Sequence, residues 1–288
     1  MNVLYAGSAG SLSVLPLRAL CKAGHRPCAV AVDAGDNRLS QRRDLPVVSE
    51  NQDSLESLAL LHDLPLIRLS RDAGSAAQQI RAYSPDIVFV SCFARKIPHE
   101  VLSVAPIGCF NLHPSALPAY RGPEPVFWQF RDGVSEMGVT LHRMSAQLDA
   151  GDIISQTSVT IPNGVTMQQA GVLLAEAGSR IIVQALSRHG QVDWSGLAQQ
   201  ADGASYQRFP TEPDYVVSTG WPAKRLFNFI RATCRQGVVY PCAVDKRIYN
   251  LVEAISFQET GEARLVVKGA ELTLPCSPGF IRARFLQG

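Results

Sequence analysis

An amide and an imidazole lie two positions apart in the segment 108–118, which reads GCFNLHPSALP. The apolar start of this segment and its proline-bounded end predict a strand that runs into a loop. On extended backbone, side chains i and i+2 point to the same side. Asn111 and His113 are therefore expected on the same side of the strand, near its end. There a hydrogen-bond donor and a titratable ring could act on one substrate.

A carboxylate follows a second stretch, which reads GVTLHRM at 138–144 and LDAGD at 148–152. This stretch predicts another strand, which ends in a glycine-containing turn that carries Asp149. His142 lies in an alternating strand between Leu141 and Arg143, so we expect it to have a structural role. Asp152, beyond the glycine, is expected to be an ordinary loop residue.

Each of these residues also has a purely structural explanation. An isolated histidine usually packs in a core, and an asparagine often forms a turn. Asp149 by itself would be expected only to stabilise its turn. Asn111 and His113 on the same side of one strand end are harder to explain in this way, so their pairing favours a catalytic site.

The elements that would position these side chains alternate between strand and helix. Apolar runs predict four early strands, at residues 2–5, 28–32, 65–69 and 86–90. This alternation predicts an α/β fold with a Rossmann-like, doubly wound and mostly parallel sheet that is covered on both faces. Ligands bind such sheets beyond the carboxyl ends of the strands. That rule places three segments around one crevice, residues 91–97, 111–122 and 148–152.

The chain of 288 residues is long enough for two domains. We predict a catalytic domain over residues 1–195, a linker over 196–214, and a C-terminal domain over 215–288. The last domain opens with a helix, and short runs with Gly or Pro turns follow, which indicates a small β-barrel of the OB-like type. The polar segment 33–49 is expected to be a surface loop near the substrate.

Composition narrows the class of protein further. The net charge is only +2, so no overall field favours nucleic acid. The seven cysteines are odd in number and scattered, which favours reduced thiols in the cytoplasm over a disulfide framework. No ligand spacing indicates a metal. We expect neither a signal peptide at the N-terminus nor an apolar run long enough to cross a bilayer.

Taken together, these motifs resemble the formyltransferase family that uses 10-formyltetrahydrofolate. The family pattern is Asn-x-His, a Ser-Leu-Leu-Pro-like loop, Arg-Gly, and a Gly-Val-Thr strand ending in Asp-x-Gly. In this sequence it stands as NLH at 111–113, SALP at 115–118, RG at 121–122, GVT at 138–140 and DAG at 149–151. The closest-looking members are the methionyl-tRNA formyltransferases and the formyltransferases of amino sugars.

The resemblance implies a mechanism in which an amine attacks the formyl carbon of 10-formyltetrahydrofolate, the co-substrate, without a metal. Asn111 and His113 as an imidazolium would stabilise the developing oxyanion. Asp149 would favour the charged ring and help to remove the proton of the amine through a water molecule. Two segments would border the folate. Their predicted cofactor-binding residues are Phe93, Arg95, Ile97, Ser115, Ala116, Leu117 and Pro118, the first three acting chiefly through the backbone.

The acceptor amine stays open between methionyl-tRNA and an amino sugar nucleotide or other small amine. Residues 200–288 hold 11 Lys and Arg against 8 Asp and Glu, which permits tRNA binding but does not require it. Two hypotheses from other classes compete. One is a nucleotide-dependent oxidoreductase that uses the Gly7–Gly10 loop, although this loop lacks GxGxxG. The other is an RNA-binding module without catalysis. The sequence does not determine the oligomeric state.

Overall fold

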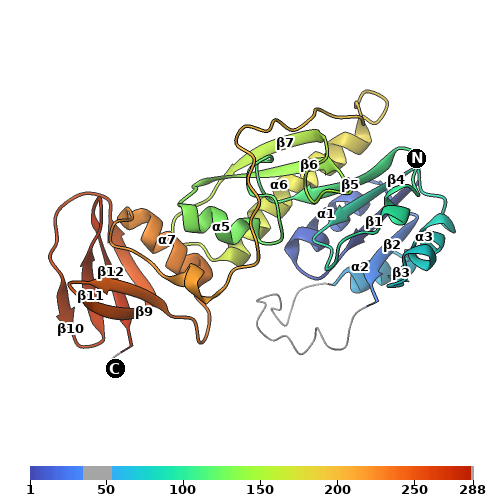
Figure 1. The fold of residues 1–288 in the computed structure, drawn as a ribbon. Helices are drawn as coiled ribbons and strands as arrows, with labels where there is room; N and C mark the ends of the chain where they lie inside the picture. Colours follow the sequence, from blue (N-terminus) through green and yellow to red (C-terminus); the bar gives the residue numbers. More distant parts are fainter. Residues whose placement is uncertain (35–53, 287–288) are drawn as a thin grey trace. The chain divides into compact units, whose positions relative to one another are not determined.

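The computed structural model describes residues 1–34 and 54–286 (Figure 1). Most of the loop predicted at 33–49 therefore lies outside the described residues. The chain divides into two compact units. The first comprises Met1–Arg121, Gly138–Val159 and Gly171–Tyr206, and the second comprises Gly122–Met137, Thr160–Ala170 and Gln207–Gly288. The sequence-based limits of 1–195, 196–214 and 215–288 stay a prediction.

A seven-stranded sheet forms the centre of the first unit, in the order β3-β2-β1-β4-β5-β6-β7. Its strands are β1 (Val3–Gly7), β2 (Ala29–Asp33), β3 (Leu66–Leu69), β4 (Ile87–Ser91), β5 (Gly108–His113), β6 (Glu136–Arg143) and β7 (Ile153–Thr160). The five strands from β3 to β5 pair in parallel, and β6 runs antiparallel to β5. The predicted Rossmann-like, mostly parallel sheet is thus confirmed.

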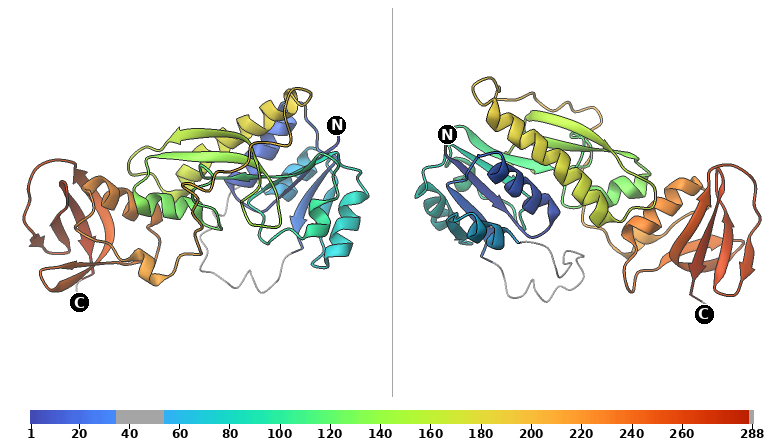
Figure 2. Two further views of the ribbon diagram at one scale, coloured as in Figure 1. Left: turned by 45° about the horizontal axis from the view of Figure 1, so that its top comes forward. Right: turned by 180° about the vertical axis from the view of Figure 1, so that it is seen from behind.

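Helices cover this sheet on both faces (Figures 1 and 2). They are α1 (Ser11–Lys22), α2 (Leu55–Leu61), α3 (Ala73–Arg81), α4 (His99–Leu102) and α6 (Met167–Ser187). Every residue of β1 and of β4 is buried. These strands are continuous apolar runs because helices cover both sides of a parallel sheet. Local signals fix the helix starts; the carboxylate of Asp72, for example, accepts from the Ser75 amide at 2.7 Å and caps α3.

Helix α6 corrects the expectation that no apolar segment reaches membrane-spanning length. Its 21 residues are long and apolar enough to cross a bilayer, judged by length and composition alone. Most of its apolar window is buried inside the protein, however. A helix that packs in a core needs the same composition, so the burial accounts for it without a membrane.

The second unit contains two helices, a 3-10 helix at Glu212–Tyr215 and a five-stranded sheet. The helices are α5 (Pro125–Asp132) and α7 (Ala223–Thr233), and the strands are β8 (Tyr240–Val244), β9 (Arg247–Gln258), β10 (Val266–Lys268), β11 (Glu271–Pro275) and β12 (Phe280–Phe285). The sheet is antiparallel, in the order β10-β11-β12-β9-β8. This confirms a separate C-terminal β structure, whereas its OB-like closure stays a prediction.

The core of the second unit is aromatic. The ring of Phe229 on α7 lies 5.5 Å from that of Phe127 on α5 and 5.9 Å from that of Tyr240 on β8. Edge-to-face aromatic pairs of this kind contribute about 0.5–1.5 kcal/mol beyond the area that they bury. These contacts explain why α5, which is distant in sequence, groups with the C-terminal sheet.

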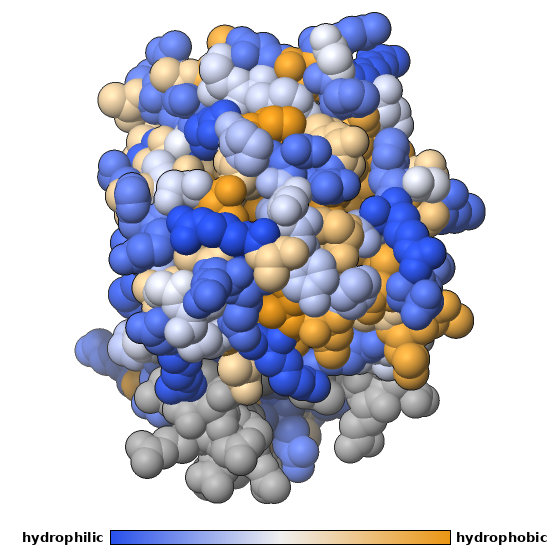
Figure 3. Space-filling model, turned by 90° about the vertical axis from the view of Figure 1, so that its right-hand side faces the viewer, coloured by the Kyte–Doolittle hydropathy of each residue, from blue (hydrophilic) through white to orange (hydrophobic). Residues whose placement is uncertain are grey.

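The exposed surface is mixed in character. Polar and charged side chains cover most of the face seen in Figure 3, and the hydrophobic ones form separate groups among them. Many apolar side chains of the first unit are instead buried, among them those of the strands β1, β2 and β4. The sheet is therefore a rigid platform for the loops at its edge.

Candidate active site at the ends of β5 and β6

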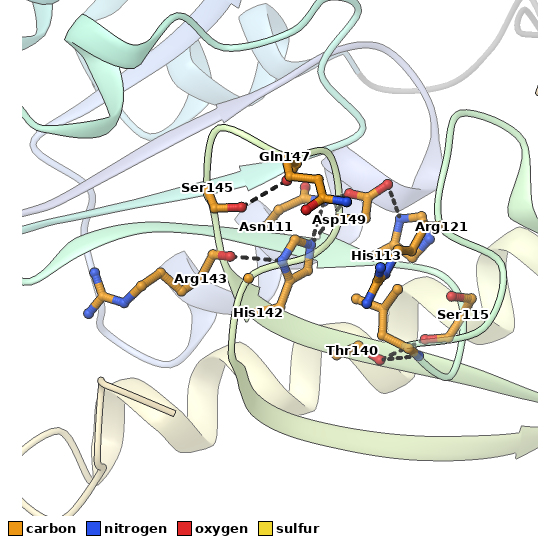
Figure 4. Close-up of polar contacts among 12 residues, drawn as sticks. Asn111, His113, Ser115, Arg121, Thr140, His142, Arg143, Ser145, Gln147 and Asp149 are labelled. Carbon is orange, nitrogen blue, oxygen red and sulfur yellow. Dashed lines mark hydrogen bonds and ion pairs between the residues drawn. The ribbon is translucent and has the colours of Figure 1, made fainter. Parts of the chain in front are cut away.

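The register between β5 and β6 assembles the polar site. Asn111 stands opposite His142, and His113 stands opposite Thr140. Directly opposed residues of an antiparallel pair project from the same face of the sheet. Four polar side chains from two strands therefore gather on one face at the end of β5, as Figure 4 shows.

The turn after β6 brings the carboxylate of Asp149 to these side chains. Asp149 has φ 52°, a left-handed conformation that is uncommon for a residue with a side chain. A Cβ atom at Gly151 would lie 1.9 Å from the Arg143 carbonyl oxygen, so only glycine fits there. The Arg143 amide also donates to the Asp152 carbonyl at 2.8 Å. Glycine at position 151 thus lets the turn close against β6.

The three predicted catalytic residues converge in space. The Asp149 carboxylate lies 3.7 Å from His113 Nδ1 and 3.5 Å from Asn111 Nδ2 (Figure 4). His113 is 4% exposed and Asp149 is 7% exposed, whereas Asn111 is only partly buried. The cluster therefore reaches solvent at Asn111. The distances are long for hydrogen bonds, which is common in active sites without substrate.

His142 belongs to the same cluster, which the sequence analysis did not anticipate. Its Nε2 lies 3.2 Å from Asn111 Nδ2 and 3.5 Å from Asp149. Its Nδ1 lies 3.0 Å from the Arg143 carbonyl oxygen, which can only accept, so Nδ1 carries the proton. Nε2 consequently accepts from the amide of Asn111 and fixes its orientation. The expected structural role did not place His142 in this cluster, because the alternation along β6 does not reveal its register with β5.

The protonation of His113 follows from its surroundings. Its Nε2 donates to the Tyr120 carbonyl oxygen at 2.9 Å, so Nδ1 faces Asp149. Burial lowers the pKa of His113, the carboxylate of Asp149 raises it by a smaller amount, and the net direction is downward. The lowered pKa favours the neutral ring at rest. In the resting ring the cost of burial outweighs the attraction of Asp149, and the imidazolium expected during the reaction stays a prediction.

Thr140 fixes the loop that follows β5. Its hydroxyl donates to the Ser115 carbonyl at 2.7 Å and accepts from the Leu117 amide at 3.2 Å and from Gln156 Nε2 at 2.7 Å. A Cβ atom at Gly138 would lie within 2.5 Å of the backbone and side chain of Ala116. The Gly-Val-Thr strand thus lets the Ser-Ala-Leu-Pro loop pack directly on β6. Ser115 and Leu117 are buried in this loop, Ala116 is exposed and Pro118 is half-buried.

The other predicted cofactor-binding residues lie after β4. Arg95 pairs with Asp33 at 2.8 Å and donates to the carbonyls of Leu69 and Ser70, so its side chain ties the ends of β2 and β3 to this segment. Phe93 is half-buried, and Ile97 is buried in the core. The structure thus gives the Arg95 side chain structural contacts. That the segment acts on the folate chiefly through its backbone stays a prediction.

A metal site and a phosphate-binding loop are the other two kinds of site that the sequence brings into question. Among the described residues, no group of three His, Cys, Asp or Glu side chains is arranged to hold a metal ion. At the Gly7–Gly10 turn, the Ser8 amide donates to the Ser13 hydroxyl, which in turn donates to the Ser91 carbonyl. A phosphate-binding loop needs such amides to face the ligand. The Ser8 amide is therefore used in an internal bond of the turn.

The chain is similar in sequence to known formyltransferases. A protein-family model described as "Formyl transferase" matches residues 45–186. The methionyl-tRNA formyltransferase of Pelotomaculum thermopropionicum is 31% identical over 231 residues, which are 80% of this chain and 72% of that protein.

Two solved structures share the fold over nearly the whole chain. An N-formyltransferase from Helicobacter canadensis, determined with folinic acid and dTDP-3-aminofucose, has a TM-score of 0.70, 20% identity and 99% coverage of each chain. The methionyl-tRNA formyltransferase from Clostridium thermocellum has a TM-score of 0.55, 13% identity and full coverage of both chains.

Proposed function

Because the chain belongs to the formyltransferase family, we propose that it moves the formyl group of 10-formyltetrahydrofolate to the primary amine of a small acceptor, such as a nucleotide-linked amino sugar. The folate is the donor in this family and acts as a co-substrate. The observation that carries the proposal is the convergence of Asn111, His113 and Asp149 at one strand end.

The proposed reaction has a simple balance. The amine nitrogen forms a bond to the formyl carbon, the bond from that carbon to N10 of the folate breaks, and the proton that the amine loses replaces the formyl group on N10. The carbonyl oxygen becomes negative in between. An amide hydrogen of Asn111 is the donor proposed to stabilise this oxygen. The hydrogen bond of Asn111 Nδ2 to the Asp149 carboxylate is long, at 3.5 Å, and the negative oxygen of the substrate would displace it.

His113 and Asp149 are proposed to handle the proton. The neutral ring has an unprotonated Nδ1 that faces the carboxylate at 3.7 Å. When the amine loses its proton, the ring becomes an imidazolium beside Asp149. The carboxylate stabilises that charged form, which in turn stabilises the oxyanion. A general base of this kind contributes about 10²–10⁴-fold to the rate.

The folate is proposed to lie against the two segments identified from the sequence. Ser115 to Pro118 would border it on one side and Phe93 to Ile97 on the other, with the backbone of Arg95 rather than its side chain turned to the ligand. A cavity of about 310 Å³ adjoins Ile97 and also contacts Ala146, in the turn before Asp149. Its position beside Ile97 supports the placement of the segment 93–97.

The charges of the second unit favour a small acceptor over tRNA. The unit holds 12 Lys and Arg against 10 Asp and Glu, a net charge of +2. Six of the twelve basic side chains pair with carboxylates. These pairs join Arg208 to Asp214, Lys224 to Glu259, Arg225 to Asp132, Arg231 to Glu253, Arg282 to Glu271 and Arg284 to Glu253. Charges neutralised in this way release few counterions to a phosphate backbone.

Methionyl-tRNA is the second candidate acceptor, because the relative that is 31% identical carries that name. Against it stands the higher TM-score of the N-formyltransferase determined with an aminated sugar nucleotide, 0.70 compared with 0.55. We also propose a cytoplasmic location, which is supported by all seven cysteines being free thiols.

The test is to incubate the protein with 10-formyltetrahydrofolate and a panel of amines that includes methionyl-tRNA and amino sugar nucleotides, and to find the amine that gains the mass of one CO. We expect a sugar nucleotide to react. Formylation of methionyl-tRNA alone, with acceptor affinity falling about 10³–10⁵-fold between 50 and 200 mM salt, would replace the small acceptor by tRNA. No formyl transfer to any amine would refute the function itself. A stability shift on adding NAD(P) would instead support the oxidoreductase hypothesis.

A further inference from the structure

Gln199 contacts the catalytic turn from a segment that the sequence predicts to be a linker. Its side-chain nitrogen donates to the Asp149 carbonyl at 2.8 Å and to the Gly151 carbonyl at 2.7 Å. Both hydrogens of the amide are used in these bonds. The turn between Asp149 and Gly151, which holds Asp149 in its left-handed conformation, is therefore fastened from outside by one side chain.

The other end of the same amide reaches the loop that orients His113. The side-chain oxygen of Gln199 accepts from Arg121 Nε at 3.1 Å and from Arg121 Nη2 at 2.7 Å. Arg121 directly follows Tyr120, whose carbonyl oxygen accepts a hydrogen bond from His113 Nε2. Gln199 thus connects the turn that carries the Asp149 carboxylate to the loop that orients the His113 ring.

Ser205 makes a second connection from the same segment. Its hydroxyl accepts from the Tyr120 amide at 2.8 Å, and its carbonyl accepts from the Arg121 amide at 2.9 Å. The segment 199–205 consequently contacts the loops of both catalytic side chains, on the Asp149 side through Gln199 and on the His113 side through Gln199 and Ser205.

The segment is itself anchored to the sheet. The ring of Trp194 packs 5.0 Å from that of Phe110 on β5, and its carbonyl accepts from Arg143 Nη2 at 2.7 Å. Leu197 then pairs through its backbone with Ile153 at the start of β7. Gln199 follows two residues later, so its position is determined by the sheet rather than by the loops that it joins.

We propose that Gln199 is a positioning residue, which sets the separation between Asp149 and His113 by holding their two loops at a fixed distance. The inference rests on the proposed function for its consequence, because the rate of formyl transfer depends on that separation. A displacement of about 1 Å in such a constellation reduces a rate by up to about 10²-fold. Gln199 itself lies outside the span matched by the formyltransferase family model, residues 45–186.

The experiment uses the full chain and two neutral replacements. Gln199→Met keeps the length and removes every hydrogen bond, and Gln199→Asn keeps the amide but is one methylene too short to span both loops. Gln200→Ala is the matched control, because the neighbouring side chain is exposed. The ring nitrogens of His113 are titrated by NMR without any ligand, and kcat and KM are then measured with 10-formyltetrahydrofolate.

The NMR result is expected to report on Asp149 directly. The groups that act on the His113 ring are Asp149, the Tyr120 carbonyl and His142, and Asp149 is the one that favours the charged ring most. When the turn moves away, the titration midpoint of His113 moves to lower pH in both Gln199 variants and not in the control. We expect kcat to fall about 10- to 100-fold with KM for the folate unchanged within about twofold.

Three outcomes separate this inference from the proposed function. If the wild type transfers formyl and both folded Gln199 variants match it in His113 titration and kcat, the positioning role is refuted while the function stands. If the wild type transfers no formyl but the His113 midpoint still moves, the function is refuted and the positioning role stands. A loss of thermal stability with kcat and titration unchanged would assign Gln199 a structural role alone and overturn the inference.

Discussion

Replacing Thr140 by valine tests whether β6 holds the loop that is proposed to border the folate. The buried hydroxyl of Thr140 makes three hydrogen bonds, one as donor and two as acceptor. Valine has nearly the same shape but none of these bonds. The Ser115 carbonyl and the Leu117 amide then lose a partner inside the protein, while Gln156 keeps its bond to the Leu117 carbonyl at 2.9 Å.

The magnitude follows from the cost of unpaired buried groups. Each costs about 1–3 kcal/mol, so the two groups unpaired by Thr140→Val should lower the free energy of unfolding by about 2–6 kcal/mol. Thr140→Ser is the control, because it keeps the hydroxyl and removes one methyl group at a cost of about 1 kcal/mol. With a urea dependence of about 2 kcal/mol per molar, the unfolding midpoints of the two variants should differ by roughly 0.5–2.5 M.

The assay has two parts. Urea unfolding followed by circular dichroism measures stability, and initial rates measure KM for 10-formyltetrahydrofolate. We expect the folate KM of Thr140→Val to rise about tenfold, because the loop 115–118 loses its support, whereas Thr140→Ser should stay near the wild type. If the two variants unfold at the same urea concentration and bind the folate equally well, the hydroxyl does not hold the loop and the reasoning fails.

Three further predictions concern the turn and the histidine. Gly151→Ala should destabilise the protein by at least about 1–3 kcal/mol, because its Cβ would lie 1.9 Å from the Arg143 carbonyl; a thermal midpoint equal to the wild type would contradict this. Asp149→Asn should reduce kcat by about 10²–10⁴-fold with the circular dichroism spectrum unchanged, and a near-normal rate would remove Asp149 from the mechanism. His113 has a lowered pKa when folded, so the unfolded state binds more protons below about pH 6.5 and the wild type should lose stability as the pH falls through that range. His113→Gln should show a smaller loss between pH 6.5 and 5, and parallel stability curves for the two proteins would disprove this origin.

The predicted fold and the placement of Asn111 and His113 were accessible because both depend on local rules. Continuous apolar runs alternating with helical patterns indicate a covered parallel sheet, and the structure has one. Period-two alternation places Asn111 and His113 on one side of β5 wherever that strand packs. The close approach of Gly151 to β6 likewise requires glycine, which makes the Asp-Ala-Gly turn visible in the sequence.

The position of His142 was not accessible in this way. It faces Asn111 only because β5 and β6 pair antiparallel with one particular register. A shift by a single residue would move His142 to the opposite face of the sheet, and nothing within β6 specifies the shift. The same limit applies to the pKa of His113. Burial by distant segments lowers this pKa more than the nearby carboxylate raises it.

By itself, the amino-acid sequence determined which chemical groups are available and that Asn111 and His113 share a strand end, because backbone periodicity and steric limits act over a few residues. Only the tertiary structure decided that His142 meets them and that Gln199 fastens the turn from a segment 50 positions away. Strand register and the approach of a distant side chain are determined by the packing of the whole unit, which no local pattern encodes.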